Sequence, residues 1–250
     1  MLSLVIFTST KGHWDHTNIY QHSLNHLNRC INPDTTFVKK IVHIKNTGTG
    51  EPIDKMVDFY RGHGFLVIQT DEDFKHHQDS FHSGYLKDIV KAYAFIESEY
   101  VLHLEDDWIF QYQIPLTFLF DTSINVLRKR PEILNVRFCH HLNEIERING
   151  LGEKHGMYWA KAIPSNFSTE LFLHNDNWSF NPHIARTRDY QLASLVLKRN
   201  LAQLSFNCEM GFAKIMRGFS DAELHLSAFN PDIARVKHLG IKDFTPEMAM

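Results

Sequence analysis

Three consecutive carboxylates, Glu105, Asp106 and Asp107, follow an apolar run in residues 100–110, YVLHLEDDWIF. The apolar run predicts a buried strand, and the acids then lie at its carboxyl end. Acids packed at a strand end repel one another, and a divalent cation such as Mg²⁺ or Mn²⁺, which prefers oxygen ligands, is the usual compensator. A turn with solvated acids is the alternative, and the charge pattern alone leaves both interpretations open.

The rest of the chain predicts an α/β fold that would bring this turn to a ligand-binding edge. Strands are predicted at residues 2–8, 36–44, 64–69, 100–104 and 134–139, and helices at 18–28, 51–63, 83–99, 116–130 and 189–198. This alternation is typical of a mostly parallel sheet flanked by helices, whose ligands bind beyond the carboxyl ends of the strands. Residues 143–168 carry a weaker pattern with several glycines, which we interpret as an acceptor-side insertion.

Several polar residues follow the predicted strands and are candidates for contacts with a bound nucleotide. Thr8, Ser9 and Thr10 open the polar loop after the first strand, and Asp71 lies in the acidic loop after the third. Lys87, on the helix before the acidic turn, either faces solvent or reaches a phosphate. These residues would share the ligand side of the sheet with the carboxylates.

Composition excludes several classes of protein. The chain has 250 residues, 43% of them hydrophobic, and a formal net charge of -3, so it lacks the basic footprint that holds a nucleic-acid backbone. Its three cysteines are widely spaced, which argues against a disulfide framework and a zinc knuckle and favours a reducing, cytoplasmic compartment. We predict neither a signal peptide nor a membrane span, because no apolar run is long enough.

The order of these segments resembles a GT-A glycosyltransferase, most closely the family-2-like branch that uses nucleotide-sugar donors. The resemblance runs from LVIFTST through FLVIQTDED and YVLHLEDDW to WSFNPHIAR, CEMGF and VKHLG. It implies a GT-A (Rossmann-like) fold in one domain over residues 1–250. Residues 1–110 would form the nucleotide-sugar-binding half, and 111–250 the acceptor-binding and catalytic half.

In that family a strand ends in a D-x-D or related motif that carries Mn²⁺ or Mg²⁺ against the donor diphosphate. The resemblance therefore assigns the metal first to Asp107 and then to Asp106, with Glu105 nearer the donor ribose or sugar. Glu-Asp-Asp stands here where the family has D-x-D, which leaves open which carboxylate binds the metal directly. The resemblance also implies that His238, in VKHLG, is a second metal ligand and that Lys237 binds phosphate.

The same resemblance supplies a catalytic base and an acceptor-binding segment. Inverting members use an acid at the start of a late helix as the base, and Glu209 in NCEMGF occupies that place. A glutamate in a first helical turn also favours the helix dipole without any catalytic purpose. Trp178, Asn181 and Arg186, in WSFNPHIAR, resemble the acceptor-side segment, where an aromatic face stacks on a sugar ring.

These features predict a metal-dependent, inverting glycosyltransferase that moves a sugar from a UDP- or GDP-sugar to a hydroxyl acceptor. A nucleotidyltransferase is one alternative, although no GxGTRL-like opening follows the first strand. A carbohydrate-binding domain that keeps the fold without turnover is another, and a retaining mechanism also stays open. The nucleotide, the sugar and the acceptor are not identified by the sequence.

Overall fold

The computed structural model of the chain describes residues 1–10, 18–71, 80–110, 116–131, 133–138, 159–162, 171–174, 182–200, 226–229 and 236–238. The strands are β1 (Leu2–Ser9), β2 (Lys39–Asn46), β3 (Leu66–Asp71), β4 (Tyr100–Glu105), β5 (Trp108–Phe110), β6 (Ile133–Arg137), β7 (Trp159–Ala162), β8 (Leu171–His174), β9 (His183–Arg186), β10 (Leu226–Phe229) and β11 (Val236–His238). The helices are α1 (Ile19–Cys30), α2 (Pro33–Thr36), α3 (Ile53–Gly62), α4 (Ser80–Tyr93), α5 (Leu116–Lys129) and α7 (Thr187–Asn200).

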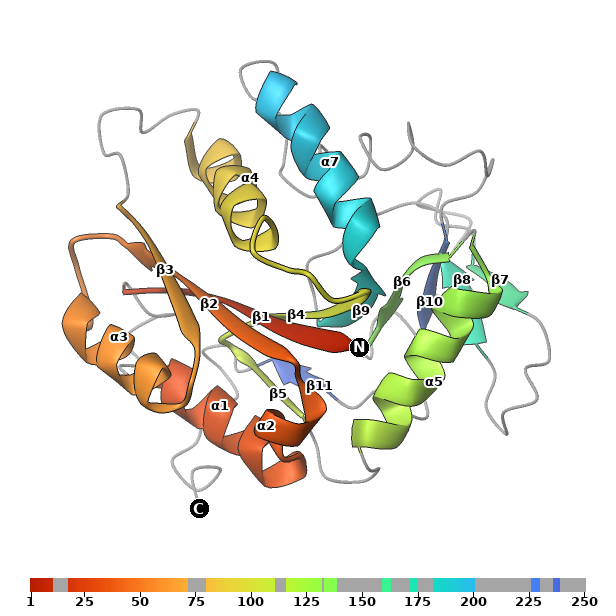
Figure 1. Cartoon of the computed structure of the whole chain (residues 1–250), viewed down its shortest axis with the longest axis horizontal. Helices are drawn as coiled ribbons and strands as arrows, with labels where there is room; N and C mark the ends of the chain where they lie inside the picture. The colour runs from red at the N-terminus through yellow and green to blue at the C-terminus, as the bar shows by residue number, and fades with distance from the viewer. Residues whose placement is uncertain are drawn as a thin grey trace.

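Nine of these strands form one sheet in the order β3-β2-β1-β4-β9-β6-β10-β8-β7, and β5 pairs separately with β11 (Figure 1). The first four strands of that order are parallel to one another. Strand β9 then runs antiparallel between β4 and β6. The predicted α/β class, with a sheet flanked by helices, is confirmed.

Helices cover both faces of the sheet, with α4 and α7 on one side and α1, α3 and α5 on the other (Figure 1). Alternation along β1 divides its side chains between two cores: Leu4 and Ile6 pack toward α1 and α3, and Val5 and Phe7 toward α4. A strand buried on both faces reads as a continuous apolar run, which is why residues 2–8 were predictable as a strand.

The same alternation operates in β4, where one face is not purely apolar. Leu102 and Leu104 join the core beneath α1 and α5, whereas Val101 and His103 face α4. Glu105 follows two residues after His103 and therefore lies on the α4 side at the end of the strand. None of the helices in the described part of the chain has the length and apolar character needed to cross a bilayer.

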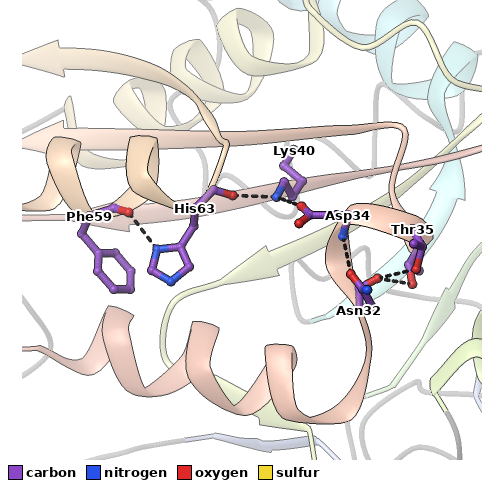
Figure 2. Close-up of polar contacts among 7 residues, drawn as sticks. Asn32, Asp34, Thr35, Lys40, Phe59 and His63 are labelled. Atoms are coloured by element: carbon purple, nitrogen blue, oxygen red, sulfur yellow. Dashed lines mark hydrogen bonds and ion pairs between the residues drawn. The ribbon is translucent and has the colours of Figure 1, made fainter.

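The amino-terminal edge of the sheet is tied together by Lys40 of β2 (Figure 2). Its Nζ lies 2.5 Å from Asp34 Oδ1 and 2.6 Å from the carbonyl oxygen of His63, which joins α2 to the turn after α3. Asn32 caps α2 by accepting the Asp34 N–H at 3.1 Å. The sequence did not predict α2, because four residues are too few to show helical periodicity.

Arg186, predicted to bind the acceptor, lies at the opposite end of β4 from the acidic turn, where it pairs with Tyr100. Its guanidinium is buried and donates from Nη1 to the Ile133 carbonyl at 2.8 Å and from Nη2 to the Pro131 carbonyl at 2.6 Å. Its Nε lies 3.3 Å from Asp189 Oδ2. These contacts fix the α5–β6 turn and give Arg186 a structural role; its contact with an acceptor stays a prediction.

We expect Arg186→Lys to lower the free energy of unfolding by about 2–4 kcal/mol, because an ammonium cannot reproduce the forked contacts with two carbonyl oxygens. Urea denaturation measures the change. Arg188→Lys is the matched control, since its side chain is 73% exposed, and we expect it to change stability by less than about 0.5 kcal/mol. Equal effects of the two substitutions would contradict the structural role.

Candidate functional site

The acidic turn lies where β1 and β4 end side by side. Phe7 of β1 pairs with Glu105 of β4, and the Asp106 N–H donates to the Phe7 carbonyl oxygen at 3.1 Å. The Thr8 hydroxyl donates to Asp106 Oδ2 in a very short hydrogen bond. The Asp106 carboxylate is thus held at the carboxyl ends of the parallel strands, the edge at which such sheets bind ligands.

Asp107 leads into β5, whose position is fixed from two sides. Asp107 and Trp108 are 3% and 4% exposed, and the Ser23 hydroxyl of α1 donates to the Trp108 carbonyl oxygen at 2.6 Å. On the other side β11 pairs antiparallel with β5, and His238 lies opposite Trp108. The backbones of the predicted metal ligands Asp107 and His238 therefore come close together, although the His238 side chain lies outside the described part.

The electrostatics of the turn disfavour ionisation of both aspartates at the same time. Burial raises the pKa of Asp106, and the neighbouring Asp107 raises it further, to about 7, against the opposing effect of the Thr8 hydrogen bond. Two carboxylates in a poorly hydrated turn are costly when both are ionised, and a hard divalent cation removes that cost. The carboxylates of Asp106 and Asp107 are therefore suitable ligands for Mg²⁺ or Mn²⁺.

The number of ligands is consistent with a substrate-bridged cation. Within the residues that the structure describes, no group of three or more His, Cys, Asp or Glu side chains is arranged to hold a metal ion. Mg²⁺ commonly uses one or two carboxylates together with substrate phosphates and water, so two aspartates are a sufficient protein contribution.

Glu105 is supported differently from the aspartates. The Tyr85 hydroxyl of α4 donates to Glu105 Oε1 at 2.9 Å, and the carboxylate is half-buried. Sequence reasoning missed Tyr85. The signal available was its spacing of eight residues from Tyr93, which places both on one face of the helix.

Two of the three candidates at the end of β1 have partners in the protein. Thr8 bonds to Asp106, and the buried Thr10 hydroxyl lies 3.0 Å from Thr47 Oγ1 and accepts the Thr47 N–H at 2.9 Å. Thr10 therefore holds the loop after β2. Ser9, half-buried, is the last residue of β1.

The remaining predicted residues are distributed around this edge. Asp71 ends β3 and accepts the Asn46 amide N–H at 2.9 Å, which places it at the same edge as the turn. Lys87 lies on the exposed side of α4, and Lys237 is described only as part of β11. The predictions for Glu209, Trp178 and Asn181 fall outside the described residues.

The charge on Asp106 predicts a dependence of stability on pH. Because the folded-state pKa of about 7 exceeds the ordinary value of 3.8, the metal-free protein loses stability as pH rises from about 4 to 7. Asp106→Asn removes this loss while keeping an acceptor for Thr8. We expect the variant's stability relative to the parent to increase by on the order of 2 kcal/mol between pH 5 and pH 8. Urea unfolding in EDTA measures it, and a pH-independent difference would contradict the shifted pKa.

No protein-family model matches the chain, and no curated protein sequence matches it. Among solved structures, GalNAc-T7 with UDP, GalNAc and Mn²⁺ is similar over 98% of this chain and 45% of that one, with 10% identity and a TM-score of 0.53. The mannosyltransferase PcManGT from Pyrobaculum calidifontis, with GDP-Man and Mn²⁺, is similar over 78% of this chain and 46% of that one, with 10% identity and a TM-score of 0.42. The 4-diphosphocytidyl-2C-methyl-D-erythritol synthase from Anaerococcus prevotii is similar over 96% and 92%, with 11% identity and a TM-score of 0.47. The chain spans less than half of the GalNAc-T7 chain, and the likeness shows a fold of the GT-A kind.

Proposed function

We propose that the chain is a metal-dependent glycosyltransferase that moves a sugar from a UDP- or GDP-sugar to a hydroxyl acceptor. The observation that carries the proposal is the pair Asp106 and Asp107 on the turn after β4, where Thr8 of β1 donates a hydrogen bond to Asp106. The likeness in fold to GalNAc-T7, whose structure holds UDP, GalNAc and Mn²⁺, supports it.

The donor side requires stabilisation of a leaving group. When the bond from the anomeric carbon to the diphosphate breaks, negative charge develops on the phosphate oxygens, and a bound Mn²⁺ or Mg²⁺ would stabilise that charge. Asp107 and Asp106 would hold the cation, with His238 as a further ligand from β11. Thr8 keeps the Asp106 carboxylate oriented toward the edge, and Lys237 would bind phosphate.

On the acceptor side, Glu209 would accept the proton of the acceptor hydroxyl as its oxygen attacks the anomeric carbon. Attack from the face opposite the leaving diphosphate inverts the configuration. Trp178 and Asn181 would bind the acceptor, with the indole stacked on a sugar ring.

We expect Asp107→Asn to abolish the metal-dependent part of nucleotide binding, because it removes one anionic ligand. Isothermal titration with UDP and GDP, with and without MnCl₂, measures it; Mn²⁺ should tighten the binding of one of them at least tenfold in the parent. Asp34→Asn is the matched control, since that carboxylate is 78% exposed at the amino-terminal edge (Figure 2) and should leave binding unchanged. Absence of metal-dependent binding of either nucleotide in the parent would contradict the function.

We expect Glu209→Gln to lower kcat by about 10²–10⁴-fold while donor affinity stays within twofold, because only proton transfer is removed. Turnover with UDP- and GDP-sugars measures the first quantity, and titration the second. The anomeric configuration of the product, determined by NMR, should be inverted. Retention would contradict the assignment of Glu209 as the base.

The two alternatives have separate signatures. Release of pyrophosphate from a nucleoside triphosphate and a sugar phosphate would identify a nucleotidyltransferase. Normal sugar binding by the parent without any turnover would identify a binding domain.

A further inference from the structure

A chain of aromatic hydrogen-bonding side chains lies between the sheet and helices α4 and α7. Its members, which we call the Tyr–His chain, are Tyr85, Tyr93, His103, His183 and Tyr190. The last four are fully buried. Ring centroids of Tyr93 and Tyr190 are 4.0 Å apart, and those of His103 and His183 are 4.9 Å apart. Hydrogen bonds in such a water-poor layer are strong and sensitive to geometry.

The directions of these hydrogen bonds follow from the protons available. The Tyr85 hydroxyl has one proton and donates it to Glu105 Oε1. In its contact with His103 Nε2, 3.4 Å away, the Tyr85 oxygen must therefore be the acceptor. His103 then carries its proton on Nε2, and its Nδ1 accepts from the Tyr93 hydroxyl at 2.8 Å. Burial and the neighbouring His183 hold the pKa of His103 well below its usual range, in agreement with a neutral ring that has one proton.

The far end of the chain continues in the same way. A hydrogen bond from Tyr190 reaches the Tyr93 hydroxyl, and His183 Nε2 makes a very short hydrogen bond with the Tyr190 hydroxyl. The Tyr–His chain thus runs from β9 and α7 through the interior to Glu105 at the ligand edge.

Helix α4, which supplies both Tyr85 and Tyr93, is fixed against the sheet by a second polar cluster. Asp88 Oδ1 accepts the Thr70 hydroxyl at 3.0 Å and lies 3.3 Å from His43 Nε2. Asp88 and His43 are both buried. Since rotation of α4 would break these contacts, the Tyr85 hydroxyl is held in place relative to β4.

We propose that Tyr85, itself held by His103 and Tyr93, positions the Glu105 carboxylate to accept hydrogen bonds from hydroxyl groups of the nucleotide-sugar donor, on its ribose or on its sugar. The inference rests on the proposed function. A glutamate at a strand end has several rotatable bonds, and fixing Oε1 determines where Oε2 lies before the donor arrives. Tyr85 is a positioning residue whose hydroxyl lowers the entropic cost of donor binding.

The test is Tyr85→Phe, which keeps the ring that packs edge-on against Phe7 at 5.4 Å and removes only the hydroxyl. We expect affinity for the donor to fall about tenfold, with affinity for Mn²⁺ alone within twofold of the parent. Titrations with UDP-glucose, UDP-GalNAc, GDP-mannose, UDP and GDP in MnCl₂ measure the first, and titration with MnCl₂ the second. Tyr100→Phe, at the other end of β4, is the matched control and should change neither.

The titrations distinguish the two sources of the hydroxyl. Weaker binding of both the nucleoside diphosphate and its sugar derivative would place Glu105 at the ribose, and weaker binding of the sugar derivative alone would place it at the sugar. In a Glu105→Ala background, Tyr85→Phe should add less than a twofold change, because its only route to the donor is gone.

NMR spectroscopy tests the hydrogen bonds of the Tyr–His chain without substrate. Imidazole ¹⁵N NMR should show His103 neutral with its proton on Nε2, and Tyr93→Phe should introduce the other tautomer and weaken donor binding. A proton on Nδ1 of His103 in the parent would contradict the hydrogen-bond directions assigned to the Tyr–His chain.

Failure of this inference is distinct from failure of the function. If the parent binds a nucleotide sugar in a metal-dependent manner and Tyr85→Phe binds it equally well, the positioning role is wrong and the function stands. If Tyr85→Phe weakens Mn²⁺ and donor equally, the hydroxyl acts on the whole turn, which also overturns the role. If the parent binds none of the donors, the function and the inference both fall.

Discussion

Repulsion between the neighbouring carboxylates of Asp106 and Asp107 is the constraint around which this edge of the sheet is built. The turn is short, Asp107 is buried, and Asp106 is half-buried and accepts a hydrogen bond from Thr8 of β1. Burial and Asp107 together raise the pKa of Asp106 to about 7, so ionising the second acid is unfavourable in the metal-free protein. In the metal-free protein the two acids therefore lower stability, and this cost supports the proposal that the pair binds a cation.

Contacts from three other elements hold the turn that carries the two aspartates. Strand β1 supplies Thr8, α1 supplies Ser23, and β11 closes the far side of β5. These contacts come from segments far apart in the sequence, and together they fix the backbone of the turn. Separating the two carboxylates by moving the backbone would break the pairing of β1 with β4. A bound cation would offset their repulsion without that movement.

Much of the fold was predictable because local periodicity and burial agree in the amino-terminal half. Strands β1 and β4 are buried apolar runs, β2 is buried over its four central residues, and β3 is a partly exposed run at the edge of the sheet. Helices α1, α3, α4 and α5 carry apolar stripes at helical spacing. Strand β9 was not predicted, since the four residues HIAR mix polar and apolar types and are buried only because β4 and β6 enclose them. The structural role of Arg186 was hidden for the same reason: its partners are carbonyl oxygens of the α5–β6 turn.

Some residues of the candidate site were predictable from the sequence and others were not. The acids of the turn are visible as a run of letters, whereas Tyr85 and Tyr93 read as part of an apolar stripe until their hydroxyl partners are known. The proximity of His238 to the turn was expected only from the family resemblance, because no local pattern joins β11 to β5.

Separate supports for the three acids favour separate tasks. Glu105 is held from the α4 face by Tyr85, whereas Asp106 is held by β1, and Asp107 leads into the β5–β11 pair. A cation shared by all three would need them to converge, and within the described residues no such three-ligand group is formed. An acid that already accepts a hydrogen bond from a tyrosine is better suited to accept another from a donor hydroxyl than to neutralise a cation. The arrangement therefore favours the aspartates as metal ligands and Glu105 as the residue that recognises the donor.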